Sequence, residues 1–172
     1  MVINRQFARA NHWTFQIKPI AELLARYVGD GKGWIDPYAG TSTWAEITND
    51  HNPDRLTRYH MLAEEFANAL SKEYNGVLYD PPYSFRQVSE HYKEMGLKAT
   101  ALDTSYNFYA RVMNPIADKI KIGGYAISFG WNSNGFGKKR GFEIVEMLIV
   151  AHGLHHNDTI VTVERKIQSK LF

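Results

Sequence analysis

The sequence of 172 residues contains no cysteine, which excludes disulfide bonds and metal sites built from thiolates. No stretch is apolar over the length of a membrane-spanning helix, and the N-terminus has no apolar run typical of a secretion signal. The formal net charge is only +2, which excludes a surface that coats nucleic acid through charge alone. We therefore expect a soluble cytoplasmic protein without membrane contact, whose contacts with any nucleic acid are local.

The composition is that of one well-packed domain. Apolar residues make up 44% of the chain and aromatic residues 13%, and the aromatic residues serve equally well as core or as stacking surfaces. A chain of this length can bury one α/β core but not two, so we expect a single domain over residues 1–172. Residues 1–14 are polar and basic, with Arg5, Arg9 and His12, and we expect an N-terminal arm there. The alternative is a surface tail without a function.

The most informative stretch is residues 77–84, where a short apolar run ends at an acid followed by two prolines and an aromatic residue. The apolar run predicts a buried strand, and the prolines hold the backbone rigid where that strand ends. In an open α/β sheet, ligands bind at the carboxyl ends of the strands. The segment Asp80-Pro81-Pro82-Tyr83 is therefore predicted to lie in a ligand-binding site.

These residue types suit the capture of a planar group that carries an amine. The exocyclic amine of a nucleobase is a poor nucleophile, because its lone pair is delocalised into the ring. The Asp80 carboxylate and the Pro81 carbonyl can accept its two N–H bonds, while Pro82 holds the turn. Tyr83 can stack on a base that has been swung out of its helix. The alternative interpretation is a strand followed by an ordinary Pro-Pro turn.

Hydrophobic periodicity predicts alternating helices and strands along the rest of the chain. Residues 18–28 have apolar side chains at helical spacing, with Pro19 in the first turn and glycines after the last. The other predicted elements are strands at 33–36, 45–50, 57–61 and 125–130, helices at 62–70 and 107–120, and an antiparallel pair of strands at 142–151 and 159–164.

A small-residue loop, 36–43, follows the predicted strand at 33–36. Small residues let the backbone approach a ligand closely, and free N–H groups there can bind a carboxylate. Asp50 ends the next predicted strand, and in nucleotide-binding α/β folds an acid at this position binds ribose hydroxyls. The alternative for Asp50 is a cap of the turn that follows it.

The helix that opens Lys18-Pro19, the loop at 36–43 and the Asp-Pro-Pro-Tyr tetrad together resemble the amino-methylating DNA methyltransferases of the adenine N6-specific type. Among these, the chain is similar to the small single-domain methylases that phages carry. The resemblance implies a Rossmann-like α/β fold, with a mostly parallel sheet of about seven strands and helices on both faces. It also implies S-adenosylmethionine as the cofactor and DNA as the partner.

The resemblance further implies roles for individual residues. The catalytic set is Asp80, Pro81, Pro82 and Tyr83. The cofactor-binding set is Lys18, Asp36, Pro37, Tyr38, Ala39, Gly40, Thr41, Ser42, Thr43 and Asp50. The chain departs from the family pattern at three positions: Tyr38 replaces a phenylalanine, Ser42 replaces a glycine, and Leu62 lies where an acid usually contacts the adenine of the cofactor. Glu64 and Glu65 lie near that last position.

The expected reaction is methyl transfer to N6 of adenine in DNA, because Asp at the first tetrad position is typical of the adenine-modifying members. The alternatives are an RNA or protein-amide methyltransferase, and a non-catalytic domain that binds S-adenosylmethionine or nucleic acid. The chain has no room for a separate target-recognition region. We therefore expect a loose or short sequence preference, or recognition supplied by a homo-oligomer or by a partner.

Residues after the tetrad and in a loop near the C-terminal half are candidates for nucleic-acid contact, because they combine aromatic rings with cations. They are Ser84, Phe85, Arg86, Trp131, Lys138, Lys139 and Arg140. The alternative for each is a solvated surface residue. Three histidines (His152, His155 and His156) lie on a predicted hairpin without the spacing of a zinc site, so we expect no metal.

Overall fold

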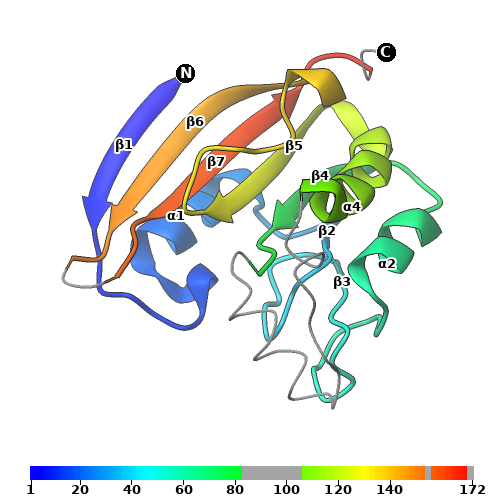
Figure 1. Cartoon of the computed structure of the whole chain (residues 1–172), viewed down its shortest axis with the longest axis horizontal. Helices are drawn as coiled ribbons and strands as arrows, with labels where there is room; N and C mark the ends of the chain where they lie inside the picture. Colours follow the sequence, from blue (N-terminus) through cyan, green and yellow to red (C-terminus); the bar gives the residue numbers. More distant parts are fainter. Residues whose placement is uncertain (83–105, 154–155, 170–172) are drawn as a thin grey trace.

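The computed structural model describes residues 1–82, 106–153 and 156–169. Its strands form one sheet in the order β3-β2-β4-β5-β7-β6-β1 (Figure 1). All neighbouring pairs are parallel except those that involve β7, which runs antiparallel between β5 and β6. The strands are β1 (Val2–Phe7), β2 (Trp34–Asp36), β3 (Ile47–Thr48), β4 (Tyr74–Tyr79), β5 (Ile120–Gly130), β6 (Phe142–Ala151) and β7 (Thr159–Lys166).

Helices cover both faces of the sheet, as predicted. Helix α1 (Lys18–Tyr27) lies on one face, and α2 (Ala63–Ala69) and α4 (Tyr106–Lys119) lie on the other (Figure 1). Short 3-10 turns, η1 (Thr14–Gln16) and η3 (Lys138–Arg140), complete the described elements. Helix α1 forms where the sequence predicts it, because Pro19 fits its first turn and the leucines Leu23 and Leu24 are almost fully buried.

Two hydrophobic cores lie on the two sides of the sheet. On one side, α2 and α4 pack through residues such as Phe66, Val112 and Ile116 against β2, β4 and the start of β5. On the other side, α1 packs against β4, β5, β6 and β7, for example through Leu24 and Val161. Both cores cover the middle of the sheet, so the carboxyl ends of β2 and β4 are held rigidly at one edge.

The N-terminal residues differ from the expected arm. Residues 2–7 form β1, which pairs in parallel with β6 at the edge of the sheet. The side chains of β1 are exposed, so the sequence has no apolar alternation that would reveal the strand. Its backbone pairing with β6, far away in the sequence, makes it a strand.

The predicted third strand at 57–61 is reduced as well. Among the described residues it is represented only by a parallel bridge between Asn49 and Tyr59. The segment between them contains Pro53 and a series of turns, which limits the length over which the two backbones can pair. The second strand, predicted at 45–50, is correspondingly short, with β3 covering two residues.

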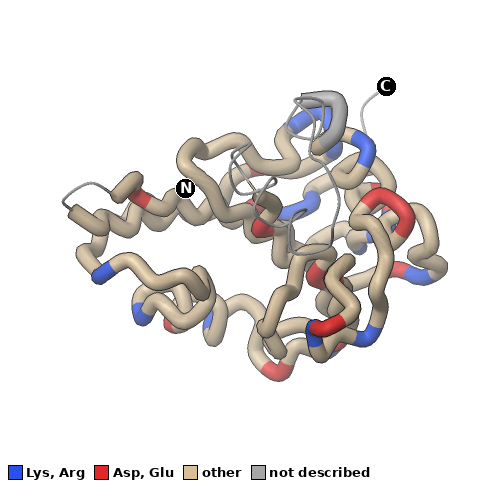
Figure 2. Tube along the Cα trace, turned by 60° about the horizontal axis from the view of Figure 1, so that its bottom comes forward, with Lys and Arg blue, Asp and Glu red and all other residues tan. Residues whose placement is uncertain are grey.

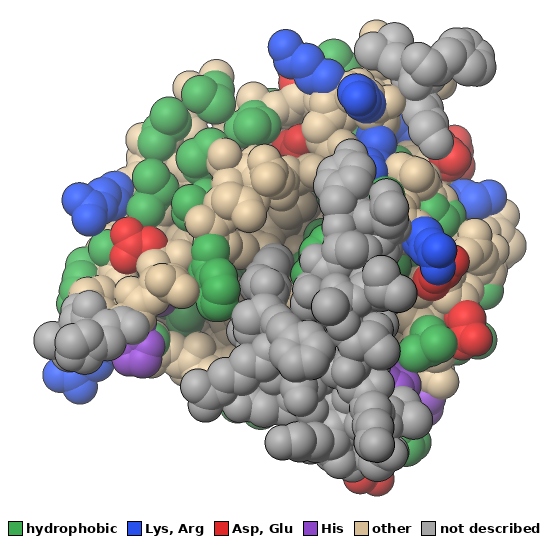
Figure 3. Space-filling model, viewed as in Figure 1, with side chains coloured by type: hydrophobic (Ala, Val, Ile, Leu, Met, Phe, Trp, Pro, Cys, Tyr) green, Lys and Arg blue, Asp and Glu red, His purple; other side chains and the backbone are tan. Residues whose placement is uncertain are grey.

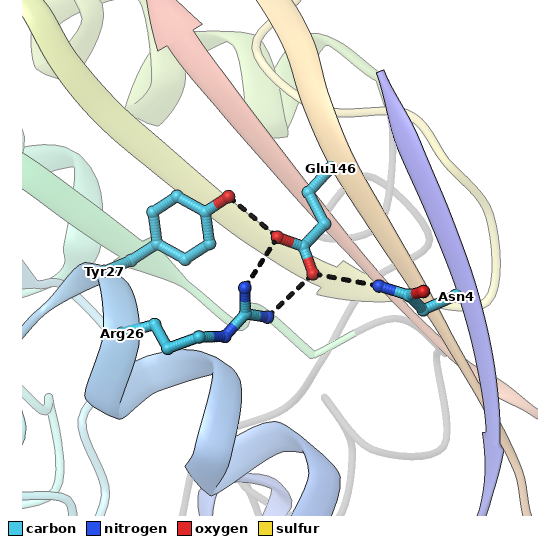
Figure 4. A network of polar contacts seen from close by, with 4 residues as sticks. All are labelled: Asn4, Arg26, Tyr27 and Glu146. Carbon is cyan, nitrogen blue, oxygen red and sulfur yellow. Dashed lines mark hydrogen bonds and ion pairs between the residues drawn. The ribbon is translucent and has the colours of Figure 1, made fainter.

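A buried carboxylate joins β1, α1 and β6 (Figure 4). Glu146 on β6 accepts two hydrogen bonds from the Arg26 guanidinium, at 2.7 and 3.2 Å, and one from the Tyr27 hydroxyl at 2.8 Å. The Asn4 amide of β1 donates to the same carboxylate at 3.3 Å. This network fixes the N-terminal strand and the end of α1 on the sheet.

The sheet face that carries α2 and α4 is covered only in part. Over β1 and the C-terminal part of β6, no described helix packs on this side, and apolar side chains gather at the surface there (Figure 3). Ile3 and Phe7 of β1 are among these exposed residues. In the described chain, no helix combines the length and the apolar character that crossing a bilayer requires.

Candidate active site

The loop after β2 is held in place by the buried side chain of Asn49. Its amide nitrogen donates to the carbonyl oxygens of Pro37 (3.1 Å) and Met61 (3.0 Å), and its amide oxygen accepts from the Met61 N–H. The Asn49 carbonyl in turn accepts from the N–H of Ala39 at 2.9 Å. Asn49 therefore fixes the loop at 37–40 at the carboxyl end of β2, a role that the sequence did not reveal.

Asp50 lies next to this loop and is largely buried. One of its carboxylate oxygens accepts from the N–H of Gly40 at 3.0 Å, and the other accepts from the N–H of Asn52 at 2.8 Å. Gly40 has φ +56°, a left-handed conformation that favours glycine. Asp50 therefore shapes the loop, and each of its oxygens keeps a lone pair that could accept a ribose hydroxyl. Ribose binding by Asp50 stays a prediction.

Asp36 ends β2 and is completely buried. Its Oδ1 accepts from the N–H of Tyr38 at 3.0 Å, whereas its Oδ2 has no hydrogen-bond partner among the described residues. Burial raises the pKa of Asp36 well above its usual value, and the charges of Asp80 and Asp50 add to this effect against the opposing hydrogen bond from Tyr38. An orphaned carboxylate oxygen beside two further acids suits a cationic ligand that donates an N–H.

The tetrad lies directly after β4, whose residues 76–79 are all buried. The Tyr109 hydroxyl of α4 donates to the Pro82 carbonyl at 2.7 Å and so ties the second proline to a helix. Asp80 is close enough to Asp36 for its charge to raise the pKa of that residue. The structure thus brings the tetrad and the loop after β2 together at one edge of the sheet. Tyr83 lies outside the described residues.

Other members of the predicted cofactor set surround this edge. Ser42, which replaces the family glycine, donates its N–H to the Ala39 carbonyl at 2.7 Å, and its hydroxyl accepts from the N–H of Trp44 at 3.3 Å. The Tyr38 ring meets the Tyr79 ring edge to face, with centroids 5.6 Å apart. Thr41 and Thr43 are exposed. Ser42 therefore fits a tight turn within the loop through its own hydrogen bonds.

Lys18 begins α1, and Trp13 lies next to the loop after β2. Lys18 is exposed, and its amino group lies 4.0 Å from the Glu22 carboxylate one turn along α1. The Trp13 side chain, which the sequence did not single out, lies over the loop, with a ring atom 3.6 Å from the point that a Cβ on Gly40 would occupy. The Arg55 guanidinium lies over the ring of this tryptophan, with its Cζ 5.7 Å from the ring centroid. Trp13 is therefore a wall of the candidate site.

Glu64 and Glu65, which lie near the position where the family has an acid, contact groups of the chain itself. The Glu65 carboxylate accepts from the N–H of Leu62 at 3.2 Å and caps the start of α2. Glu64 lies 3.9 Å from Arg111 of α4. Both interactions stabilise the packing of α2, and the role that the family gives to an acid here is not assigned to either residue.

The structure describes four of the seven residues that the sequence predicts to contact nucleic acid. Ser84, Phe85 and Arg86 lie outside the described residues. Trp131, Lys138 and Lys139 are exposed on the segment between β5 and β6. Figure 2 shows acidic and basic residues interspersed along the described chain, in keeping with a net charge of +2.

Arg140 is buried, unlike its two neighbours in the run of cations. Its guanidinium donates to the Asn114 side-chain oxygen and to the Phe136 carbonyl, both at 2.8 Å. The run of three cations suggested a surface loop, but α4 supplies an acceptor that draws the third cation inward. Arg140 therefore holds the loop on the protein, and phosphate contact by Arg140 stays a prediction.

The histidine segment also has a structural role where it is described. His152 is buried, with Nδ1 at 2.9 Å from the Ala8 carbonyl and Nε2 at 2.8 Å from the Thr159 hydroxyl. It connects the end of β6 with the residue after β1. Within the described ranges, no three or more metal-binding side chains form a group.

A cavity of about 690 Å³ opens beside the tetrad. It lies between α4, the carboxyl ends of β4 and β5, and the segment that joins β5 to β6. Pro81 and Tyr79 line it on the side of the tetrad, and Tyr109, Ser128, Phe136 and Glu164 are among its other walls. No pattern in the sequence predicts this cavity, because its walls come from elements that are far apart along the chain, among them β4, α4, β5, β6 and β7.

No protein-family model matches this chain, and no curated protein matches its sequence. Solved structures do match its fold. TrmN from Thermus thermophilus superposes with a TM-score of 0.57 and 16% identity over 88% of this chain and 49% of TrmN, so the chain spans about half the length of TrmN. SMU.1697c from Streptococcus mutans, assigned as a methyltransferase and solved with SAH, gives 0.53 and 11% over 86% of this chain and 96% of its own.

An rRNA methylase from Streptococcus thermophilus gives a TM-score of 0.53 and 10% identity, over 86% of this chain and 94% of the methylase. At such low identity these likenesses concern the fold. They show that the chain has the Rossmann-like fold of these methyltransferase structures, with the mostly parallel seven-stranded sheet that the sequence predicted.

Proposed function

We propose that this protein transfers the methyl group of S-adenosylmethionine to the exocyclic N6 amine of adenine in DNA. One observation carries the proposal: the orphaned Asp36 carboxylate and the Asp80-Pro81-Pro82 segment meet at the same edge of the sheet. In this proposal Asp36 would bind the cation of the cofactor and Asp80 the amine of the acceptor, and the charge of Asp80 already acts on Asp36. The fold shared with methyltransferase structures supports the same conclusion.

The residues around Asp36 suit S-adenosylmethionine. Asp36 Oδ2 is an acceptor without a donor, and an ammonium group is the donor that compensates a buried carboxylate best. The loop at 37–40 would lie against the ligand, with Trp13 at its side. Asp50 would accept ribose hydroxyls with its remaining lone pairs. When bound, the cofactor supplies an electrophilic methyl group on a positively charged sulfur.

The tetrad would orient the acceptor. The Asp80 carboxylate and the Pro81 carbonyl would accept the two N–H bonds of the amine and so direct its lone pair toward the methyl group. The nitrogen gains a methyl group and loses one proton, which Asp80 is placed to take. Tyr109 keeps the Pro82 carbonyl in position, so the acceptor groups are oriented before the substrate arrives. Tyr83 would stack on the extruded base.

RNA is the second candidate acceptor. The rRNA methylase from Streptococcus thermophilus, one of the structures with the same fold, acts on RNA by its name. The same tetrad chemistry would serve a base amine in either nucleic acid, because Asp80 and Pro81 contact the amine and not the sugar. The Asp at the first tetrad position favours adenine in DNA by its resemblance to the adenine-specific methyltransferases.

The test is transfer of labelled methyl from S-adenosylmethionine to unmethylated DNA and, in parallel, to RNA, with separation of the product nucleosides. We expect label on N6-methyladenine from DNA. Asp80→Ala should lower transfer by at least about 10²-fold, because it removes a group that acts on the reacting nitrogen, while cofactor binding by calorimetry stays within a few-fold of wild type.

Asp118→Ala, at an exposed acid of α4, is the matched control and should keep full activity. Label on RNA alone would show that the methyl acceptor is RNA and not DNA, and it would leave the proposed mechanism unchanged. Full activity of Asp80→Ala on any acceptor would refute the role of the tetrad, and failure to bind the cofactor would refute the proposal as a whole.

A further inference from the structure

The cavity beside the tetrad has a polar floor that the chain itself does not satisfy. Ser128 of β5 lines it and is 4% exposed, and its hydroxyl makes no hydrogen bond with any described residue. Thr162 of β7, paired with Ser128 across the antiparallel strands, is also buried and its hydroxyl also has no partner among the described residues, but Thr162 does not line the cavity. A buried hydroxyl without a partner is costly. At a cavity wall, that cost suggests a polar ligand that completes it.

The walls above this floor suit a flat ring. Tyr109 of α4 and Phe136 of the β5–β6 segment are two of the aromatic residues that line the cavity. Base–aromatic stacking tolerates any base, and a single hydroxyl at the floor adds a hydrogen bond to one ring edge. The volume of about 690 Å³ lies in the range of ordinary ligand sites and exceeds what one ring alone needs.

The cavity is also a built feature of the fold. The buried Glu164 carboxylate accepts from the N–H groups of Phe136 (2.6 Å) and Gly137 (2.8 Å), which fixes the β5–β6 segment at this distance from the sheet. A Cβ on Gly135 would lie 2.0 Å from this carboxylate, so the chain can approach it only as glycine. Arg140 secures the next turn through Asn114 and Phe136. The cavity is therefore held open by specific hydrogen bonds.

The position of the cavity and the cations at its rim indicate which kind of ligand it would bind. Pro81 lines one side, so a ring in the cavity lies next to the amine site of the tetrad. Lys138 and Lys139 line another side and are exposed, where they can meet a phosphate. A ring next to the acceptor base, joined to it through a phosphate, is the neighbouring nucleotide of the same strand.

We infer that this cavity binds the nucleobase adjacent to the methylated base, with the Ser128 hydroxyl donating to or accepting from its polar edge. The inference rests on the proposed function and extends it, because it assigns to the catalytic domain a site that selects one flanking base. The methyltransferase domain would obtain a short sequence preference of its own in this way.

The test uses the full chain with a library of short DNA duplexes, or RNA where RNA is the acceptor, that vary at the positions flanking the target. Sequencing after methylation gives the preference at each position, and fluorescence anisotropy with labelled oligonucleotides gives binding without turnover. We expect wild type to prefer one base at one flanking position. Ser128→Ala should reduce that preference about 3- to 10-fold, the value of one hydrogen bond.

Thermal stability separates this role from a structural one. Because Ser128→Ala removes an unsatisfied hydroxyl, its Tm should equal or exceed that of wild type. Thr162→Val is the matched control: its hydroxyl is equally unpartnered but does not line the cavity, so the Tm should respond in the same way while the preference stays. Ala110→Phe, at the cavity wall on α4, should abolish the preference by filling the space, whereas Ala25→Phe on the exposed side of α1 should not.

The outcomes distinguish the two proposals. Methylation with an unchanged flanking preference in Ser128→Ala and Ala110→Phe overturns the base-binding role of the cavity and leaves the proposed function intact. Absence of methylation with oligonucleotide binding that depends on Ser128 supports the cavity and overturns the proposed function. Oligonucleotide binding that depends on neither Ser128 nor Ala110 overturns the inference in either case.

Discussion

Glu146 and Asp36 are two buried acids on one sheet with opposite surroundings. Glu146 receives hydrogen bonds from Asn4, Arg26 and Tyr27, and the Arg26 bond above all lowers its pKa (Figure 4). Asp36 receives one hydrogen bond, and burial raises its pKa well above the usual value. Among the described residues, both carboxylate oxygens of Glu146 thus have hydrogen-bond donors, whereas only one oxygen of Asp36 has a donor.

The difference indicates which of the two is built for stability. The partners of Glu146 lie on two other elements, Asn4 on β1 and both Arg26 and Tyr27 on α1. The carboxylate of β6 therefore joins elements that would otherwise separate. Among the described residues, Asp36 accepts a hydrogen bond only from Tyr38 of its own loop, and its unpartnered Oδ2 lowers the stability of the folded protein. Such a cost is typical of ligand-binding sites, where the missing partner comes with the ligand.

The largest effect is expected from removal of the compensated acid. Glu146→Ala should lower the free energy of unfolding by about 2–3 kcal/mol, because it removes charge-assisted hydrogen bonds at a buried site, whereas Arg26, which is more than half exposed, can return to water. Urea unfolding checks this value. The matched control on the same strand is Glu143→Ala at an exposed acid, which should change stability by no more than about 0.5 kcal/mol.

The Glu146 variant should leave cofactor binding unchanged where the protein is folded, because the network lies away from the candidate site. A loss of cofactor affinity larger than the loss of folded protein would show that the two acids belong to one coupled system. In that case the contrast between a stabilising and a ligand-binding carboxylate would fail.

Asp36→Asn should have the opposite effect on stability. The raised pKa of Asp36 means that the folded protein binds a proton more tightly than the unfolded chain, so stability falls as the pH rises above the ordinary value of about 3.9. Asn removes this slope, and at pH 7 the variant should be more stable by about 1–2 kcal/mol. Glu146, whose pKa is lowered, gives the reverse slope, with stability lost as the pH falls through its folded pKa.

The same substitution should weaken binding of S-adenosylmethionine by about 10- to 100-fold, because a neutral amide replaces the carboxylate that faces the ammonium group. Calorimetry in buffers of different ionisation enthalpy should show that wild type releases a proton on binding and that Asp36→Asn does not. A variant that is less stable at pH 7, or that binds as tightly as wild type, would contradict the assignment of Asp36 as the open acid.

The sequence predicts those parts of the fold that depend on local patterns. The tetrad, the loop after β2 and the helix at 18–28 are local patterns, and the structure has β4, Asp36 and α1 where those patterns indicate. The antiparallel pair at the C-terminus was predicted for a similar reason, since residues 142–151 and 159–164 are rich in residues that favour strands. Local chemistry and periodicity were sufficient for these elements, but not for β1 or for the extent of the third strand.

Features that depend on distant partners were not predictable. The strand β1 has exposed side chains and is a strand only because β6 pairs with it. Arg140 lies in a run of cations typical of a surface, yet Asn114 of α4 makes it a buried residue. Ser128 has no distinguishing neighbour in the sequence, and its unpartnered state follows from the packing of β7 and the β5–β6 segment around it. In each case the decisive group is far away along the chain.

The smallest effect concerns one bond of the Glu146 network. Tyr27→Phe removes the 2.8 Å hydrogen bond of its hydroxyl to the carboxylate and should lower stability by about 1 kcal/mol at pH 7. Burial raises the pKa of Tyr27 to about 12, so the folded protein holds this proton more tightly than the unfolded chain. Between the unfolded value near 10 and about 12, wild type should therefore lose more stability as the pH rises than Tyr27→Phe, which keeps the raised pKa values of Tyr74, Tyr79 and Tyr109 but not that of Tyr27.

Urea unfolding of both proteins from pH 8 to pH 12 would measure this convergence. Tyr125→Phe is the control, because its ring packs edge to face on Tyr27 with centroids 5.3 Å apart and it lies on the neighbouring strand β5. A constant difference between wild type and Tyr27→Phe across that range would show that the phenol does not share its proton with Glu146. The compensation of Glu146 would then rest on Arg26 and Asn4, and the contrast with Asp36 would be smaller by one hydrogen bond.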